Sequence, residues 1–190
     1  MLISCGKEAI DPKQPESGIG TVEPTQQIDN REIVQINSSG NYGIYDMSGQ
    51  FIKKVNNNLI DSDYNTDFKE LNQSKDFSTN AQLELELKYI KIWDTELNTI
   101  YNKLQTKLNL KENEELIESQ KGWLKYHMKE SELVKQVFYL RDSGQILGSQ
   151  GKIQIQQAIK GRLRERTLEL MEYYSMLGNN VEFVYKGVNN

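Results

Sequence analysis

The stretch that decides the fold covers residues 93–126 and reads WDTELNTIYNKLQTKLNLKENEELIESQKGWLKY. Its first part places Asp94, Leu97, Asn98 and Tyr101 three or four residues apart. Side chains at this spacing share one face of an α-helix. The stretch therefore predicts a helix with a mixed polar and aromatic face.

A second polar and aromatic set follows one helix later. It consists of Gln120, Trp123 and Tyr126, which step by three residues and line one side of the next helix. By periodicity alone, the two sets form the contact between two adjacent helices, with core aromatic rings. Buried amides at such a contact would need each other as hydrogen-bond partners.

Apolar stripes at helical spacing extend this pair into a body of three helices. They predict helices over residues 79–108, 111–140 and 152–177. Because the first turn is short, the first two helices should form an antiparallel hairpin. Two capping-box pairs mark the helix starts, Thr79 with Gln82 and Asn109 with Glu112.

Single residues within these helices carry further expectations. Gly122 has no side chain, so we expect a neighbouring element to approach it closely. Arg162, Arg164 and Arg166 lie beside Glu165 and Glu169 and predict a solvated charged face. Gly178 is placed to end the third helix.

The chain outside the helices divides into segments of different character. Alternation and glycine-containing turns predict a β-hairpin over residues 32–55, and residues 56–77 read as a connecting loop. The helical domain covers residues 78–178, and residues 179–190 hold a last strand, 181–185, and a tail. The predicted fold class is mainly α, a three-helix antiparallel bundle with a small antiparallel β appendage from residues 32–55 and 181–185.

The N-terminus predicts a lipid anchor. Residues 1–5, MLISC, resemble a bacterial lipobox, in which Cys5 would carry the lipid. No basic or apolar region precedes Leu2, so we expect the export signal to lie upstream of the given start. Residues 6–31 hold all three prolines and few apolar residues, which is typical of a disordered tether.

Composition excludes several classes of function. A net charge of -4 over 190 residues argues against a basic nucleic-acid-binding face. The sequence contains no apolar run of the roughly 20 residues that a membrane span needs. Cys5 is the only cysteine, so no intrachain disulfide can form, and the single histidine, His127, excludes a multi-histidine metal site. We predict no metal and no cofactor.

Taken together, the two sets resemble the LprI-type lysozyme inhibitor domain family. Its members carry Asp-x-x-Leu-Asn-x-x-Tyr and, one helix later, Gln-x-x-Trp-x-x-Tyr. The resemblance covers about residues 83–174 and includes the Gly148-Ser149 loop. The residues that match the family motifs are Asp94, Leu97, Asn98, Tyr101, Gln120, Trp123, Tyr126 and Arg166.

The chain departs from this family after the second motif. Members usually continue Tyr-Arg-Asp-x-x-Cys, whereas here Tyr126 is followed by His127 and Met128, and Ser131 stands at the cysteine position. The second cysteine is replaced by residues 157–158, Gln-Ala. The family's Arg-Asp pair and its disulfide are therefore absent.

The resemblance implies a protein partner, a lysozyme-type muramidase. The candidate binding surface is the glycine-rich loop 141–151 with Tyr126, His127, Glu130 and Ser149. Acidic complementarity to a basic enzyme is the expected mode of recognition.

Three hypotheses about function follow. The leading one is a non-catalytic lipoprotein of the cell envelope, facing the periplasm or the surface, that binds and inhibits a muramidase. The alternative is a structural or assembly module of the envelope that does not bind lysozyme. An enzyme is third: Asp94 with Glu96, or Glu130 with His127, have acid–base chemistry, but no nucleophile accompanies them, and we predict no catalytic residue. The oligomeric state stays open.

Overall fold

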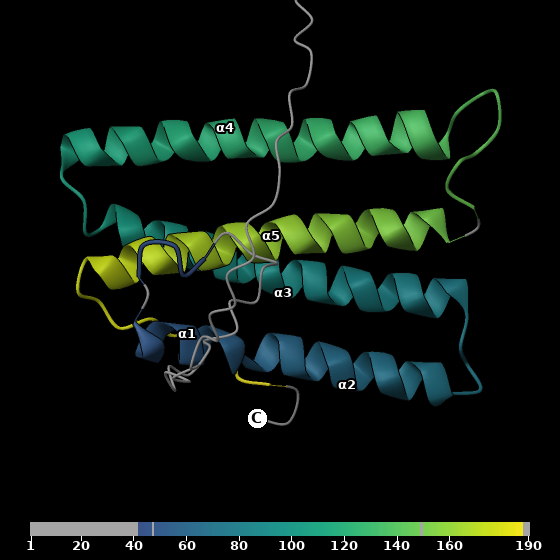
Figure 1. Cartoon of the computed structure of the whole chain (residues 1–190), viewed down its shortest axis with the longest axis horizontal. Helices are drawn as coiled ribbons and strands as arrows, with labels where there is room; N and C mark the ends of the chain where they lie inside the picture. Colours follow the sequence, from purple (N-terminus) through teal and green to yellow (C-terminus); the bar gives the residue numbers. More distant parts are fainter. Residues whose placement is uncertain (1–41, 47, 149, 188–190) are drawn as a thin grey trace, which may run out of the picture. The chain divides into compact units, whose positions relative to one another are not determined.

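A computed structural model describes residues 42–46, 48–148 and 150–187 (Figure 1). All of them belong to the unit Asn37–Asn190, and the unit Met1–Ile36 lies outside the described residues. Within the described residues there are six helical segments and no strand. In chain order they are α1 Gly49–Asn56, α2 Leu59–Gln73, α3 Thr79–Gln105, α4 Leu110–Val134, the π-helix η1 Lys135–Tyr139, and α5 Gly151–Met176.

The pair formed by α3 and α5 is the centre of the fold. The two helices pack along each other, with α2 against α3 on one side and α4 against α5 on the other (Figure 1). The core around this pair includes Tyr89, Trp93 and Leu97 from α3 and Leu163 and Leu170 from α5. Each large apolar side chain buried in this way stabilises the fold by about 1.5–3 kcal/mol.

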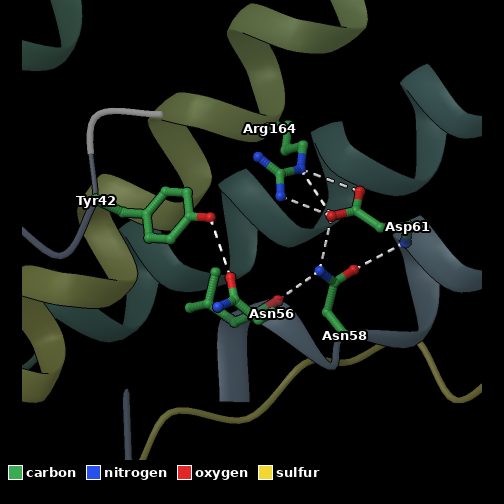
Figure 2. A network of polar contacts seen from close by, with 6 residues as sticks. Tyr42, Asn56, Asn58, Asp61 and Arg164 are labelled. Carbon is green, nitrogen blue, oxygen red and sulfur yellow. Dashed lines mark hydrogen bonds and ion pairs between the residues drawn. The ribbon is translucent and has the colours of Figure 1, made fainter. Parts of the chain in front are cut away.

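An ion pair joins the start of α2 to α5 (Figure 2). Arg164 donates three hydrogen bonds of 2.7–3.0 Å to the carboxylate of Asp61. Asn58 caps α2, because its Oδ1 accepts from the Asp61 backbone N–H at 2.8 Å and its Nδ2 donates to the same carboxylate at 2.8 Å. The Tyr42 hydroxyl donates to Asn56 Oδ1 at 3.2 Å beside them. One carboxylate thus ties the turn between α1 and α2 to the central pair.

The three long helices confirm the sequence-based prediction to within a few residues. The capping box of Asn109 and Glu112 is present at the start of α4. α5 is followed by Gly178 at φ 76°, a left-handed conformation that favours glycine. At α3, however, Ser78 is the N-cap, and its Oγ accepts from the Ala81 N–H at 3.1 Å. Thr79, the predicted cap, is already helical.

The predicted β appendage and loop are wrong where the chain is described. Residues 49–56 form α1 in place of a strand, and α2 occupies most of the predicted loop 56–77. Ser48 caps α1. The buried residues of this helix, Phe51 and Val55, lie four residues apart, which is helical spacing. Short apolar runs of this kind suit either a strand or a helix. Residues 32–41 of the predicted hairpin lie outside the described residues.

The predicted last strand is an irregular segment without strand partners among the described residues. It is held by Glu96 of α3, whose carboxylate accepts from the backbone N–H groups of Val184 at 3.1 Å and Tyr185 at 2.6 Å. Glu96 is only 1% exposed. Phe183 adds an edge-to-face contact with Trp93, with the ring centroids 6.2 Å apart. A buried carboxylate therefore takes the place of the predicted strand pairing.

Candidate functional site

A groove runs between α3 and α4, and we call it the α3/α4 groove. It has a volume of about 530 Å³, and residues of α5 also line it. Polar and charged side chains alternate with apolar ones along its walls. The lining residues are Ile90, Lys91, Asp94, Leu97, Asn98, Tyr101, Ile117, Gln120, Lys121, Trp123, Leu124, His127, Ile159 and Leu163.

On the α3 side of this groove, three polar or charged residues are exposed: Lys91, Asp94 and Asn98. Asp94 and Asn98 lie one helical turn apart. Asn98 Nδ2 donates to the backbone carbonyl of Asp94 at 2.8 Å, which fixes the amide on the helix surface. Among the described residues, the Asp94 carboxylate has no hydrogen-bond or ion-pair partner. Hydrogen-bonding groups of Asp94 and Asn98 are thus available to a ligand.

On the α4 side, Gln120 belongs to a buried polar cluster. Gln120 Oε1 accepts from Arg166 Nε at 3.0 Å, and the same guanidinium donates to Ser119 Oγ at 3.0 Å and to Glu169 Oε2 at 2.7 Å. Arg166 is only 5% exposed, so the predicted solvated face is wrong at this position. Arg166 instead joins α5 to α4, because burying a guanidinium requires that its donors be paired.

Trp123 and His127 form a stacked pair next to this cluster. Their ring centroids lie 4.9 Å apart with the planes 23° from parallel. Arg162 Nε approaches His127 Nδ1 at 3.5 Å, and its Nη2 donates to Ser131 Oγ at 2.6 Å. Burial lowers the pKa of His127 below its usual range, and the adjacent charge of Arg162 lowers it further. The imidazole is therefore neutral at pH 7.

A second depression, which we call the α4 hollow, lies on a different face of α4. It has a volume of about 450 Å³. Tyr126, Leu133 and Val137 supply apolar surface at intervals of seven and four residues, so they form one row along the helix. The remaining lining residues are polar or charged: Lys129, Glu130, Glu132 and Gln136.

The segment after α4 is folded back on η1. The backbone N–H groups of Ile146 and Leu147 both donate to the Phe138 carbonyl, at 3.0 and 2.9 Å. Gly151 lies so close to Tyr139 that an added Cβ would fall 2.7 Å from the ring. Single-turn π-helices are frequently found at functional sites.

These features can be compared with known proteins. A family model described as lysozyme inhibitor LprI matches residues 58–170, more than half of the chain. The chain belongs to the LprI family. No curated protein and no solved structure matches it.

Within this LprI domain, most of the motif residues meet in one place. Six of them line the α3/α4 groove: Asp94, Leu97, Asn98, Tyr101, Gln120 and Trp123. Arg166 lies in the buried cluster with Gln120, and Tyr126 lies in the α4 hollow. The motif therefore marks the junction of three helices, part of it buried and part lining a groove.

The residues predicted to bind a partner do not form one surface. Tyr126 and Glu130 share the α4 hollow, whereas His127 lines the α3/α4 groove. With a rise of 1.5 Å per residue, the loop beyond Leu140 begins roughly 20 Å along the helix from Tyr126. Ser149 lies outside the described residues. The described residues of the predicted binding surface are thus divided between two separate depressions and a distant loop.

The carboxylates considered for acid–base work are also separated. Glu96 is buried against the C-terminal segment, while Asp94 is exposed in the groove. Glu130 and His127 line different depressions. The described residues contain no group of three or more His, Cys, Asp or Glu side chains that could hold a metal ion. Among the described helices, none is both long enough and apolar enough to cross a membrane.

Two contacts in the structure were not predicted from the sequence: those of Glu96 and those of Gly151. The buried role of Glu96 has no signal in the spacing of polar residues, because its partners are backbone groups far along the chain. The close approach expected at Gly122 is also wrong, since a Cβ added there would meet open space. The close approach is at Gly151, which the sequence showed only as part of a glycine-rich loop.

Proposed function

We propose that this chain is a non-catalytic protein of the cell envelope, whose LprI domain binds a lysozyme-type muramidase and inhibits it by one-to-one binding. The observation that carries the proposal is the match of residues 58–170 to the lysozyme inhibitor LprI family. The family description names an inhibitor of lysozyme, and one-to-one binding is the mode of inhibition that we propose. The geometry of the domain then suggests which surface makes the contact.

The α4 hollow is the surface that best fits a protein partner. Tyr126 is 55% exposed, Leu133 50% and Val137 40%, so an apolar row faces solvent on the outer side of the bundle. Exposed apolar rows with polar rims mark protein–protein contacts, and tyrosine is enriched among the residues that dominate binding energy.

Charge supports a basic partner. α4 carries six glutamates against four lysines, and the whole chain has a net charge of -4. Glu130 and Glu132 border the apolar row directly. Acidic groups on the rim of an interface steer a basic enzyme toward it and raise the association rate.

The envelope location is part of the proposal. Cys5 lies outside the described residues, and its lipobox-like context supports lipidation. Acyl chains on Cys5 would anchor the domain to a membrane surface without a spanning segment. Expression of the gene with its upstream sequence, in cells fed radiolabelled palmitate, tests this. We expect the wild-type chain to be labelled and the Cys5→Ala variant to remain unlabelled. An unlabelled wild-type chain would contradict lipidation.

Titration of muramidase activity tests the inhibition. We expect the full chain to abolish turnover of cell-wall substrate near a one-to-one ratio. Leu133→Glu should weaken inhibition by about tenfold or more, because it places a charge in the centre of the contact. Leu110→Glu is the matched control, since Leu110 is 81% exposed on the same helix but far from the hollow.

The outcomes separate the hypotheses. Full muramidase activity at a large molar excess of the chain would reject inhibition. If the enzyme stays active but other envelope proteins are retained by wild type and lost with Leu133→Glu, the chain is an assembly module instead. Equal effects of Leu133→Glu and Leu110→Glu would reject the α4 hollow as the contact.

A further inference from the structure

The α3/α4 groove has a chemistry that differs from that of the α4 hollow. Its apolar wall comes from Leu97, Ile117 and Leu163, and its aromatic group is Trp123. Its volume of about 530 Å³ falls in the range of small-molecule sites, roughly 300–1,000 Å³. Such sites combine an apolar lining with a few polar groups that fix the ligand.

We propose that the α3/α4 groove is a saccharide-binding site for an oligosaccharide with hydroxyl and acetamido groups. The juxtaposition that carries this is one aromatic ring, that of Trp123, with the exposed carboxylate of Asp94 and the exposed carboxamide of Asn98 in the same groove. A pyranose has apolar C–H faces and a rim of hydroxyl groups. It therefore needs an aromatic or aliphatic surface together with both donors and acceptors.

The aromatic part of the site is held in place. Trp123 stacks on His127, and His127 is in turn fixed through Arg162. An indole with a set orientation loses little entropy when a sugar face packs on it. The neutral imidazole adds no charge that a sugar would have to offset.

The polar part of the site offers donors and acceptors together. Asp94 provides an unpaired carboxylate and Asn98 a free amide oxygen, since only Asn98 Nδ2 is used within the helix. Across the groove, Gln120 uses its Oε1 for Arg166, so its amide N–H groups have no partner among the described residues. Tyr101 supplies a phenol at the same wall. Vicinal hydroxyl groups, which donate and accept, match this set.

The charge balance disfavours other small ligands. Lys91 and Lys121 line the groove with Asp94, and Lys121 is already paired with Glu118 at 2.7 Å. The net charge of the groove is therefore close to zero. A phosphate needs clustered cationic donors, so it does not suit this site. An acyl chain would leave these polar groups desolvated and unpaired, which is costly.

Titration of the full chain with chitotriose, a trisaccharide of N-acetylglucosamine, tests the proposal. Only two tryptophans are present, and Trp93 is 1% exposed, so tryptophan fluorescence reports on Trp123. We expect a saturable change with a dissociation constant on the order of 0.1–1 mM, typical of a shallow polar site. Cellotriose, which lacks the acetamido groups, should bind at least about threefold more weakly.

Single substitutions test whether the saccharide binds in the α3/α4 groove. Asp94→Ala and Asn98→Ala should each weaken binding by about threefold or more, because each removes a hydrogen-bonding group. Both positions are exposed, so these variants keep the fold. Calorimetry on Trp123→Ala should show a loss of about tenfold or more. Tyr126→Ala, one turn away in the α4 hollow, should stay within about twofold of wild type.

Three results would overturn the proposal. One is no saturable signal with either trisaccharide up to about 10 mM, a concentration at which millimolar sites fill. Another is binding that Asp94→Ala and Asn98→Ala leave unchanged. The third is loss of muramidase inhibition in these variants without any trisaccharide binding, which would assign the groove to the protein partner. Inhibition through the α4 hollow does not depend on any of these outcomes.

Discussion

At the scale of single residues, His127 shows how its surroundings set a charge. It is half-buried, stacks on Trp123 and lies beside Arg162. Burial is the largest cause that lowers the pKa of His127, and the charge of the Arg162 guanidinium lowers it further. The charge of Asp94 raises it. A histidine with a lowered pKa binds fewer protons in the folded chain than in the unfolded chain at pH below about 6.5.

This predicts a loss of stability on mild acidification. The contribution of His127 is fully present above pH 6.5 and is lost as the pH falls through its folded pKa. His127→Gln should make the unfolding free energy less dependent on pH between about 7.5 and 5. Chemical denaturation across this range measures it. As the only histidine, His127 also gives a single NMR titration curve, and a midpoint at or above 6.5 would contradict the account.

Glu172 is a second residue whose role is set by its surroundings. Its side chain is fully buried in α5, and its Oε1 accepts from the backbone N–H groups of Tyr45 at 2.6 Å and Asp46 at 2.7 Å. Asp46 in turn accepts from Ser175 Oγ at 2.6 Å. The segment before α1 is thus fixed to α5 by charge-assisted hydrogen bonds, which are stronger than neutral ones.

Glu172→Ala should lower the unfolding free energy by about 2–4 kcal/mol, because two backbone N–H groups lose a buried carboxylate acceptor. Glu172→Gln keeps one acceptor oxygen and should cost less. Denaturant unfolding of the full chain measures both variants. Glu165→Ala on the same helix is the control, since Glu165 has no partner among the described residues, and an equal loss there would argue against the specific role of Glu172.

At the scale of elements, the return from α4 to α5 depends on close packing at η1. Tyr139 and Leu147 converge on Gly151, where an added Cβ would lie 2.7 and 2.8 Å from their nearest atoms. Gly151 is buried at the first position of α5. Its lack of a side chain therefore sets how closely the segment after α4 folds back on the bundle.

Gly151→Ala should destabilise the chain by about 1–3 kcal/mol through overpacking. Gly122→Ala is the matched control in α4, because its Cβ meets open space. It should stabilise the chain by about 0.5–1 kcal/mol through helix propensity alone. Thermal unfolding of the two variants measures the contrast. Equal effects of the same sign would show that Gly151 is not a packing constraint.

At the scale of the whole molecule, periodic patterns in the sequence predicted the long helices but not the short helices or the contacts between distant residues. The stripe through Trp93 and Leu97 and the capping box at Asn109 are local patterns, so the three long helices followed from them. The family followed instead from the resemblance of the motif residues between Asp94 and Tyr126. α1 and α2 were missed, because a short segment such as 49–56 suits a strand or a helix equally well and its neighbours decide. The site could be predicted only in part, since Arg166 binds Gln120 and Ser119, which lie 46 and 47 residues away in the sequence.

The same limit explains the division of the predicted binding surface. Tyr126 and His127 are adjacent in sequence, yet successive helical residues point about 100° apart and here line different depressions. The family motif marks the α3/α4 groove, while the exposed apolar row of the α4 hollow lies largely outside it. The α3/α4 groove and the α4 hollow therefore support two separate proposals.

The central proposal is that the outer face of α4 contacts a muramidase. Hydrogen–deuterium exchange of the full chain, with and without a lysozyme-type muramidase in slight excess, tests it most directly. We expect slower exchange in peptides that cover residues 126–140, and no change in peptides from α2. No protection anywhere in the chain, or protection confined to other helices, would contradict the account.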